Sequence, residues 1–207
     1  MGKLELRMSA FRDEINAGYQ EIQKLLYWVE IYMTEGWLGV PEMAFLYMAA
    51  KRCSKGCIVE LGSWQGLSTI FLSKGTEAGF KRTVYAIDPH TSTLIHRLNE
   101  QEDTFRSFKT TCDIFHLGNV QPLRTYSYEA VKTWEEPIGL LFIDADHEYE
   151  PVKQDFEQWY PHILKGGMII FHDFDKPGVC QVVQQVWESG LVKNRCGVNM
   201  TMAFEKS

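Results

Sequence analysis

A glycine-containing turn flanked by two acidic residues is the first feature of this sequence that could do chemistry. An apolar run ends at Glu60 and Leu61, Gly62 and Gly66 follow, and a second apolar run ends at Asp88. A strand, a glycine turn, a helix and a second strand ending in a carboxylate form one half of a nucleotide-binding βαβ unit. In such a unit the turn meets the backbone of the ligand and the acid meets its ribose.

The residues inside this turn narrow the choice of ligand. Dinucleotide-binding turns need glycine at three points because a pyrophosphate lies against the helix N-terminus, whereas bulky Trp64 and Gln65 stand between the two glycines here. Glu60 would repel a phosphate but could accept hydrogen bonds from an ammonium group. S-adenosylmethionine has an ammonium group and a ribose and no phosphate, so the sequence predicts this ligand and disfavours NAD.

Four carboxylates follow two later apolar runs. Asp144 and Asp146 come after the first run, and Asp173 and Asp175 come after the second. Like charges brought together repel one another unless a cation or protons intervene, and oxygen ligands without cysteine suit magnesium or calcium. The sequence predicts a divalent cation here, with helix caps and solvated loop acids as the alternative.

Two histidines accompany these acids. A histidine with a pKa near neutral can take a proton from a substrate hydroxyl as a methyl group is transferred to it. His147 is a candidate for that base, and capping of the helix that begins near Tyr149 is its alternative role. His172 is expected to bond a neighbouring backbone group or carboxylate.

Three blocks of the sequence resemble a known family. The run from Val59 to Ser68 resembles motif I of class I S-adenosylmethionine-dependent methyltransferases, particularly the small O-methyltransferases of the catechol and caffeoyl-CoA type. The runs 141–150 and 164–173 are most similar to the bacterial branch that includes macrocin-type sugar O-methyltransferases. Together the matches cover roughly residues 35–175.

The resemblance implies a set of cofactor-binding residues along one rim of the sheet. The turn is expected to meet the methionyl part, Asp88 the ribose and Ser127 the adenine. Tyr126 stands where the family often has an acid, and an adenine contact by Tyr126 is less strongly expected. The full expected set is Glu60, Gly62, Ser63, Gly66, Ser68, Asp88, Ser127 and Asp144.

The resemblance also implies the catalytic and metal residues. In metal-dependent members, the positions matching Asp144 and Asp173 hold the ion, and the third ligand is usually the residue after the second acid. Here that residue is Phe174, so Asp175 is the expected replacement in a magnesium site. In the macrocin-like branch the histidine three residues after the first acid is the proposed base, and His147 has that spacing beside Asp144.

The elements that must position these residues alternate along the chain. This alternation predicts an α/β fold with a Rossmann-like, doubly wound sheet, whose ligand lies at the carboxyl ends of the strands. The family implies seven strands, mostly parallel, with an antiparallel last strand. We expect strands near 57–61, 83–87, 121–126, 139–143, 168–172, 191–195 and 199–205, and helices near 41–53, 66–76, 101–113, 128–134, 149–163 and 179–189.

The N-terminal part of the chain is predicted to be helical. Apolar residues recur every three or four positions from about 8 to 33, which is typical of an amphipathic helix. Its apolar face packs either on the domain's own flank or on a partner helix in a homodimer. We expect one domain over 1–207, with a helical extension over about 1–53 and a cofactor-binding core over about 54–207. Trp37 and Trp64 flank the cofactor if the turn near 35–38 folds over it, and otherwise belong to the core.

Composition limits the class of protein. The net charge of −6 argues against a nucleic-acid surface. No apolar run is long enough for a membrane span, and the N-terminus lacks the apolar core of a signal peptide. The five cysteines show no paired CxxC spacing, which favours reduced thiols in a cytoplasmic protein over a metal site.

These observations predict an S-adenosylmethionine-dependent methyltransferase. Its acceptor is expected to be a hydroxyl of a small molecule, such as a sugar or a natural product, with possible assistance from magnesium. The alternative is a non-catalytic sensor or interaction protein of the same fold that binds the same cofactor.

Overall fold

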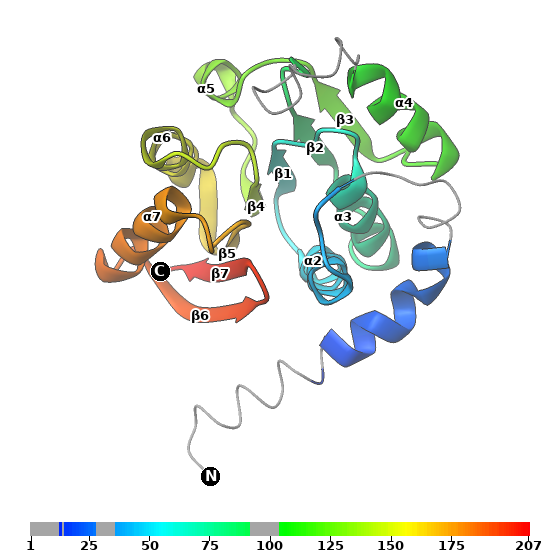
Figure 1. The fold of residues 1–207 in the computed structure, drawn as a ribbon, viewed down its shortest axis with the longest axis horizontal. Coiled ribbons are helices and arrows are strands. Elements are labelled where there is room, and N and C mark those ends of the chain that lie inside the picture. Colours follow the sequence, from blue (N-terminus) through cyan, green and yellow to red (C-terminus); the bar gives the residue numbers. More distant parts are fainter. Residues whose placement is uncertain (1–12, 14, 28–35, 92–103) are drawn as a thin grey trace.

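The chain folds around a seven-stranded sheet with helices on both faces (Figure 1). The computed structural model describes residues 13, 15–27, 36–91 and 104–207. The spatial order of the strands is β3-β2-β1-β4-β5-β7-β6, and β7 alone runs antiparallel to the other six strands. This confirms the predicted doubly wound sheet. The strands are β1 (Cys57–Leu61), β2 (Val84–Ile87), β3 (Val120–Leu123), β4 (Ile138–Ile143), β5 (Ile163–Phe171), β6 (Val192–Val198) and β7 (Thr201–Lys206).

The helices connect the strands and cover the sheet. The described residues 15–27 form one helix ahead of the sheet. The others are α2 (Val40–Arg52), α3 (Leu67–Ala78), α4 (Thr104–Ile114), α5 (Ser127–Ala130), α6 (Tyr149–Trp159) and α7 (Pro177–Glu188), with short 3-10 turns at Val131–Thr133 and Tyr160–His162.

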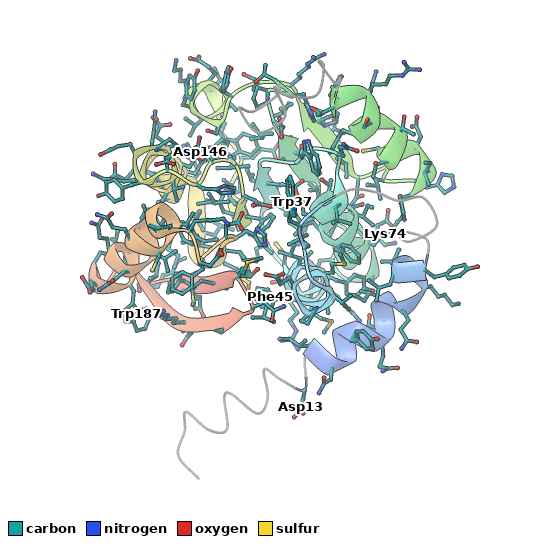
Figure 2. All side chains as sticks on the ribbon, in the orientation of Figure 1. Asp13, Trp37, Phe45, Lys74, Asp146 and Trp187 are labelled. Atoms are coloured by element: carbon teal, nitrogen blue, oxygen red, sulfur yellow. The ribbon has the colours of Figure 1, made fainter. Side chains whose placement is uncertain are left out.

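Alternation along the strands divides the core into two layers. Successive strand residues point to opposite faces, so Ile58 packs with α2, α3 and α4 while Val59 packs with α6 and α7. Both residues are fully buried, as expected for a central parallel strand. Figure 2 shows the side chains on both sides of the sheet, with buried Phe45 of α2 on one side and, on the other, exposed Trp187 of α7, which stacks on Phe204.

Some predicted element boundaries were wrong. The helix expected over 149–163 ends at Trp159, because Pro161 has no N–H to continue the helical bonds. Strand β5 then begins at Ile163, five residues before the expected start at Met168, and it contains the glycines expected in a connection. The helix expected over 128–134 is an α-helix of four residues followed by a 3-10 turn. Strand β3 ends at Leu123 rather than near Tyr126.

The described part of the N-terminal helix packs on its own domain. Ile22 is fully buried, and Leu25 and Leu26 pack against the same core layer as α2. Glu21 accepts hydrogen bonds from the Tyr47 hydroxyl at 3.0 Å and from the Lys51 ammonium at 2.6 Å. The rest of the predicted helix lies outside the described residues, and a homodimer through it stays a prediction. None of the described helices is long and apolar enough to cross a membrane.

Candidate functional site

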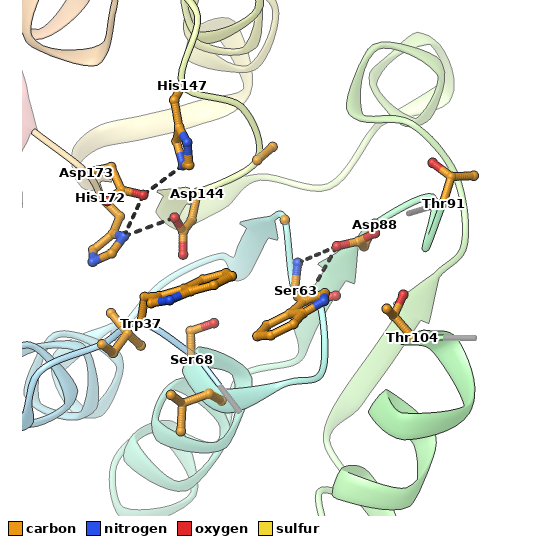
Figure 3. A pocket seen from close by; sticks show the side chains of 16 residues that line it. Trp37, Ser63, Ser68, Asp88, Thr91, Thr104, Asp144, His147, His172 and Asp173 are labelled. Carbon is orange, nitrogen blue, oxygen red and sulfur yellow. Dashed lines mark hydrogen bonds and ion pairs between the residues drawn. The ribbon is translucent and has the colours of Figure 1, made fainter. Parts of the chain in front are cut away.

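A cavity lies at the carboxyl ends of β1, β2, β4 and β5 (Figure 3). Its walls come from residues 36–38, the glycine turn with the start of α3, the end of β2, and the loops after β4 and β5. This is the edge of an open α/β sheet where ligands bind. Seven of the predicted site residues line it, namely Gly62, Ser63, Ser68, Asp88, Asp144, His147 and Asp173.

Gly62 makes the close approach of two strand ends possible. Its φ is +86°, and a Cβ atom at this position would lie 2.2 Å from the carbonyl oxygen of Asp144. A side chain here would therefore collide with backbone as well as strain the turn. The N–H of Asp144 in turn donates to the Leu61 carbonyl at 2.8 Å. The glycine turn and the loop after β4 are thus held together as one wall of the cavity.

Asp88 ties the end of β2 to the same turn. Its Oδ2 accepts hydrogen bonds from the N–H groups of Ser63 at 3.0 Å and Trp64 at 2.8 Å, and its Oδ1 accepts one from the N–H of His90 at 2.6 Å. A carboxylate offers about four lone-pair sites. Asp88 therefore orders the turn and has about one site left for a ligand that enters the cavity.

Ser63 presents an unsatisfied polar atom to this site. Its Oγ is buried and has no hydrogen-bond partner among the described residues, although Ser63 lines the cavity. Buried hydroxyls normally have a partner, and one that lacks it requires an explanation. A ligand in the cavity would supply the missing partner.

Glu60 lies beneath the turn and does not line the cavity. It is fully buried, and its two oxygens accept hydrogen bonds of 2.5 Å from the hydroxyls of Ser68 and Thr69. Burial raises the pKa of Glu60 to about 8, against the opposing effect of these two hydroxyls. Near pH 7 Glu60 is thus mostly a neutral acid. The expected direct contact with an ammonium group stays a prediction.

This buried acid leads to a pH prediction. Because the folded pKa of Glu60 lies above its ordinary value of 4.5, its contribution to stability is complete below pH 4.5 and is lost as the pH rises toward 8. The loss amounts to roughly 5 kcal/mol at about 1.4 kcal/mol for each pKa unit. Glu60→Gln removes this titration, so its stability relative to the parent chain should rise between about pH 5 and pH 8.5. Urea unfolding of both cofactor-free proteins measures this difference in the free energy of unfolding. If the two free energies changed in parallel with pH, Glu60 would be ionised throughout.

Ser127 and Tyr126 lie outside the cavity wall. The Ser127 hydroxyl donates to Asp155 of α6 at 2.5 Å, and burial raises the pKa of Asp155 to about 6. Tyr126 is 45% exposed and stacks on Tyr128. The sequence did not indicate Asp155 as the partner of Ser127. The predicted adenine contact of Ser127 stays untested by this arrangement.

Two acids and two histidines converge at the other end of the cavity. His172 Nδ1 lies 3.1 Å from Asp144 Oδ1 and 3.3 Å from Asp173 Oδ2, and His147 Nε2 lies 2.7 Å from Asp173 Oδ2 (Figure 3). His172 is buried with 3% exposure, whereas the side chain of His147 is 43% exposed. His172 therefore bonds neighbouring carboxylates as expected, and His147 is the more accessible of the two histidines.

The charges in this group shift one another's protonation. Burial raises the pKa of Asp144, although the hydrogen bond from His172 opposes it. Burial by itself would also raise the pKa of Asp173. The hydrogen bonds from both histidines outweigh this effect and hold the Asp173 pKa well below its usual range. The hydrogen bond to Asp173 raises the pKa of His147. Asp173 is thus the ionised partner of the accessible histidine.

Three of these residues could hold a cation. One ligand atom from each of Asp144, His147 and Asp173 lies within 4.8 Å of the others. Asp175, the expected third ligand, is not part of this group, because its half-exposed carboxylate lies near the Lys176 ammonium instead. At this point Asp173 has a φ of +52°, and the Phe174 N–H donates to the Met200 carbonyl.

Two tryptophans cover the middle of the cavity. The rings of Trp37 and Trp64 stack with centroids 4.9 Å apart and planes 9° from parallel, and both residues line the cavity (Figure 3). Trp37 is 66% exposed, so it is not a core residue. This arrangement agrees with the interpretation that the turn before α2 folds over the pocket.

Comparisons with known proteins agree with this fold. A family model described as a methyltransferase domain matches residues 59–174. An uncharacterized protein of Acanthamoeba polyphaga mimivirus is 31% identical over 121 residues, which is 56% of this chain and 50% of that protein, so the chain spans half the length of this relative.

Two solved structures are similar in fold. The O-methyltransferase NovP aligns with a TM-score of 0.66 and 18% identity over 82% of this chain and 81% of that one. An O-methyltransferase from Bacillus cereus in complex with SAH aligns with a TM-score of 0.63 and 17% identity over 92% of this chain and 91% of that one.

Proposed function

The chain belongs to the methyltransferase domain family, and from this premise we propose that it transfers a methyl group from S-adenosylmethionine to a hydroxyl oxygen of a small molecule. The observation that carries the proposal is one cavity with two different ends. One end is the glycine turn with Asp88, and the other is the group of Asp144, His147, His172 and Asp173.

The turn end fits an adenosyl ligand with a methionyl tail. Gly62 lets the ligand approach the backbone, the unpartnered Ser63 hydroxyl is available to it, and Asp88 has a lone pair left for a ribose hydroxyl. Solved relatives in fold include an O-methyltransferase in complex with SAH, which supports the choice of ligand. Glu60 acts from below the turn through its hydrogen bond with Ser68, which lines the cavity, and Gly66 is the N-cap of α3.

The acid and histidine end fits removal of a proton from the acceptor. When the His147 Nε2–H donates to Asp173, the lone pair of the neutral ring is on Nδ1. We assign the acceptor proton to that nitrogen, and Asp173 stabilises the imidazolium that forms. S-adenosylmethionine supplies an electrophilic methyl group, whose carbon leaves sulfur as the new bond to oxygen forms. The chain's task is in-line positioning and exclusion of water.

A cation-assisted reaction is the second candidate, favoured by the three ligand atoms within reach of one ion. Asp144, His147 and Asp173 would hold the ion, which would supply Lewis acidity at the acceptor oxygen. A nitrogen ligand beside two carboxylates suits manganese or zinc as well as magnesium. Because His147 cannot accept a proton while it ligates a cation, the two candidates differ in an observable way.

The cation site yields a prediction with a matched control. Asp173→Asn should abolish binding of Mn²⁺, because it removes one of three candidate ligands, whereas Asp175→Asn should leave it unchanged. Titration calorimetry with Mn²⁺ alone measures both variants. If both variants lost Mn²⁺ binding equally, Asp175 would be a ligand as well. No binding by the parent chain at millimolar Mn²⁺ would favour the reaction without a cation.

The proposed function is tested by binding and turnover. Titration calorimetry should detect binding of S-adenosylmethionine and none of NAD. Mass spectrometry should then detect S-adenosylhomocysteine when a panel of catechols and sugar diols is added. Binding without turnover on any acceptor would favour the non-catalytic alternative, and absence of binding would refute the proposal.

A further inference from the structure

Glu42 is a buried acid outside the cavity that no sequence pattern indicated. It lies in the first turn of α2 and is 1% exposed. A buried carboxylate is costly unless it is hydrogen-bonded. Its Oε2 accepts from the Gly39 N–H at 2.8 Å, and its Oε1 accepts from the Met200 N–H at 3.1 Å and the Thr201 hydroxyl at 3.0 Å. Glu42 thus joins the start of α2 to the β6–β7 turn.

Glu42 also faces the ring of His172. Its Oε1 lies 3.5 Å from His172 Nε2, which is an ion-pair distance without a hydrogen bond, while Nδ1 on the other side of the ring faces Asp144 and Asp173. The imidazole therefore lies between one carboxylate on α2 and two at the end of the cavity. A ring with a defined neighbour at each nitrogen has one preferred orientation, and such outer contacts commonly set the geometry of the groups that touch substrate.

We propose that Glu42 is a positioning residue for the site. It holds the His172 ring so that Nδ1 points to Asp144 and Asp173, and His172 thereby sets the two carboxylates beside His147. The expected effect of Glu42 on turnover rests on the proposed function. The expected effect of Glu42 on the orientation of the His172 ring does not. It also links the segment that carries Trp37 to the group that handles the acceptor, because Gly39 lies two residues after Trp37.

Thr201 provides a matched control for this role. Its hydroxyl bonds the same Oε1 atom of Glu42, and among the described residues no hydrogen bond or ion pair joins the Thr201 side chain to the His172 ring. Glu42→Gln changes the group that faces the ring, while Thr201→Val removes only the bond from β7. Any loss of stability at this joint should appear in both variants, and a loss of positioning should appear in the first alone.

The experiment records ring ¹⁵N–¹H correlations of histidine-labelled, cofactor-free protein, with His172 assigned from a His172→Gln variant. Glu42→Gln should shift the ring signals of His172, and Thr201→Val should leave them unchanged. With the best acceptor of the panel, Glu42→Gln should lower kcat by about 10-fold to 100-fold, the range for outer-shell substitutions. The affinity for S-adenosylmethionine should stay that of the parent chain in both variants.

Two results would overturn the inference. One is a Glu42→Gln variant whose ring signals and kcat match those of the parent chain. The other is a Thr201→Val variant that reproduces both changes, since Glu42 would then be a structural joint only. If the parent chain fails to bind S-adenosylmethionine, the proposed function is wrong, and the ring signals still decide whether Glu42 positions His172.

Discussion

Replacing His147 by alanine is expected to lower turnover by about 10²-fold to 10⁴-fold, which is the usual contribution of a positioned general base. The affinity for S-adenosylmethionine should barely change, because the side chain lies at the acid and histidine end of the cavity, away from the turn and Asp88. Single-turnover formation of S-adenosylhomocysteine gives the rate, and calorimetry gives the affinity.

His116→Asn is the control for this loss. His116 is an exposed histidine in the loop after α4, outside the cavity, and its replacement should leave turnover unchanged. Added imidazole should restore part of the activity of His147→Ala if the missing group is a base. A His147→Ala variant as active as the parent chain would transfer the role to an ionised carboxylate. Loss of turnover on chelation would favour the cation-assisted candidate instead.

Asp88→Ala is expected to weaken binding of S-adenosylmethionine by more than about tenfold, since it leaves hydrogen-bonding groups without partners. Two N–H groups of the turn, from Ser63 and Trp64, lose their acceptor at the same time as the ribose does. Titration calorimetry of both proteins measures the change. Unchanged affinity would refute the assignment of the turn as the cofactor site.

A second ligand separates the ribose contact from the ordering of the turn. S-adenosylhomocysteine and its 2′,3′-dideoxy analogue differ only in the two ribose hydroxyls. If Asp88 binds a ribose hydroxyl, the parent chain should prefer the natural ligand and Asp88→Ala should lose that preference. Equal weakening of both ligands by Asp88→Ala would mean that Asp88 only shapes the turn.

The sequence was sufficient to predict which acidic residues lie at the carboxyl edge of the sheet. Asp88, Asp144 and Asp173 each end an apolar run, and the carboxyl ends of parallel strands meet at one edge, so local pattern alone brings these residues together. The structure places all three on one cavity. The antiparallel direction of the last strand came from the family resemblance rather than from the pattern, and the spatial order of the strands was not predicted.

Contacts between distant segments could not be predicted. Glu42 reads as an ordinary first-turn acid of a helix, and Met200, one of its partners, lies 158 residues away. The partner of Ser127 is on α6, in a helix whose own pattern shows only which face is apolar. The expected ligand role of Asp175 stays a prediction, because the three described residues whose ligand atoms come together are Asp144, His147 and Asp173.

The stacked indoles of Trp37 and Trp64 give the protein an optical signal of its own. Two rings 4.9 Å apart are close enough for their electronic transitions to couple, and transition moments skewed within the two ring planes would give a paired band in the circular dichroism spectrum. A ligand that enters the cavity and separates the rings abolishes this band. The loading of the pocket can therefore be followed spectroscopically in unlabelled protein, before any acceptor has been identified.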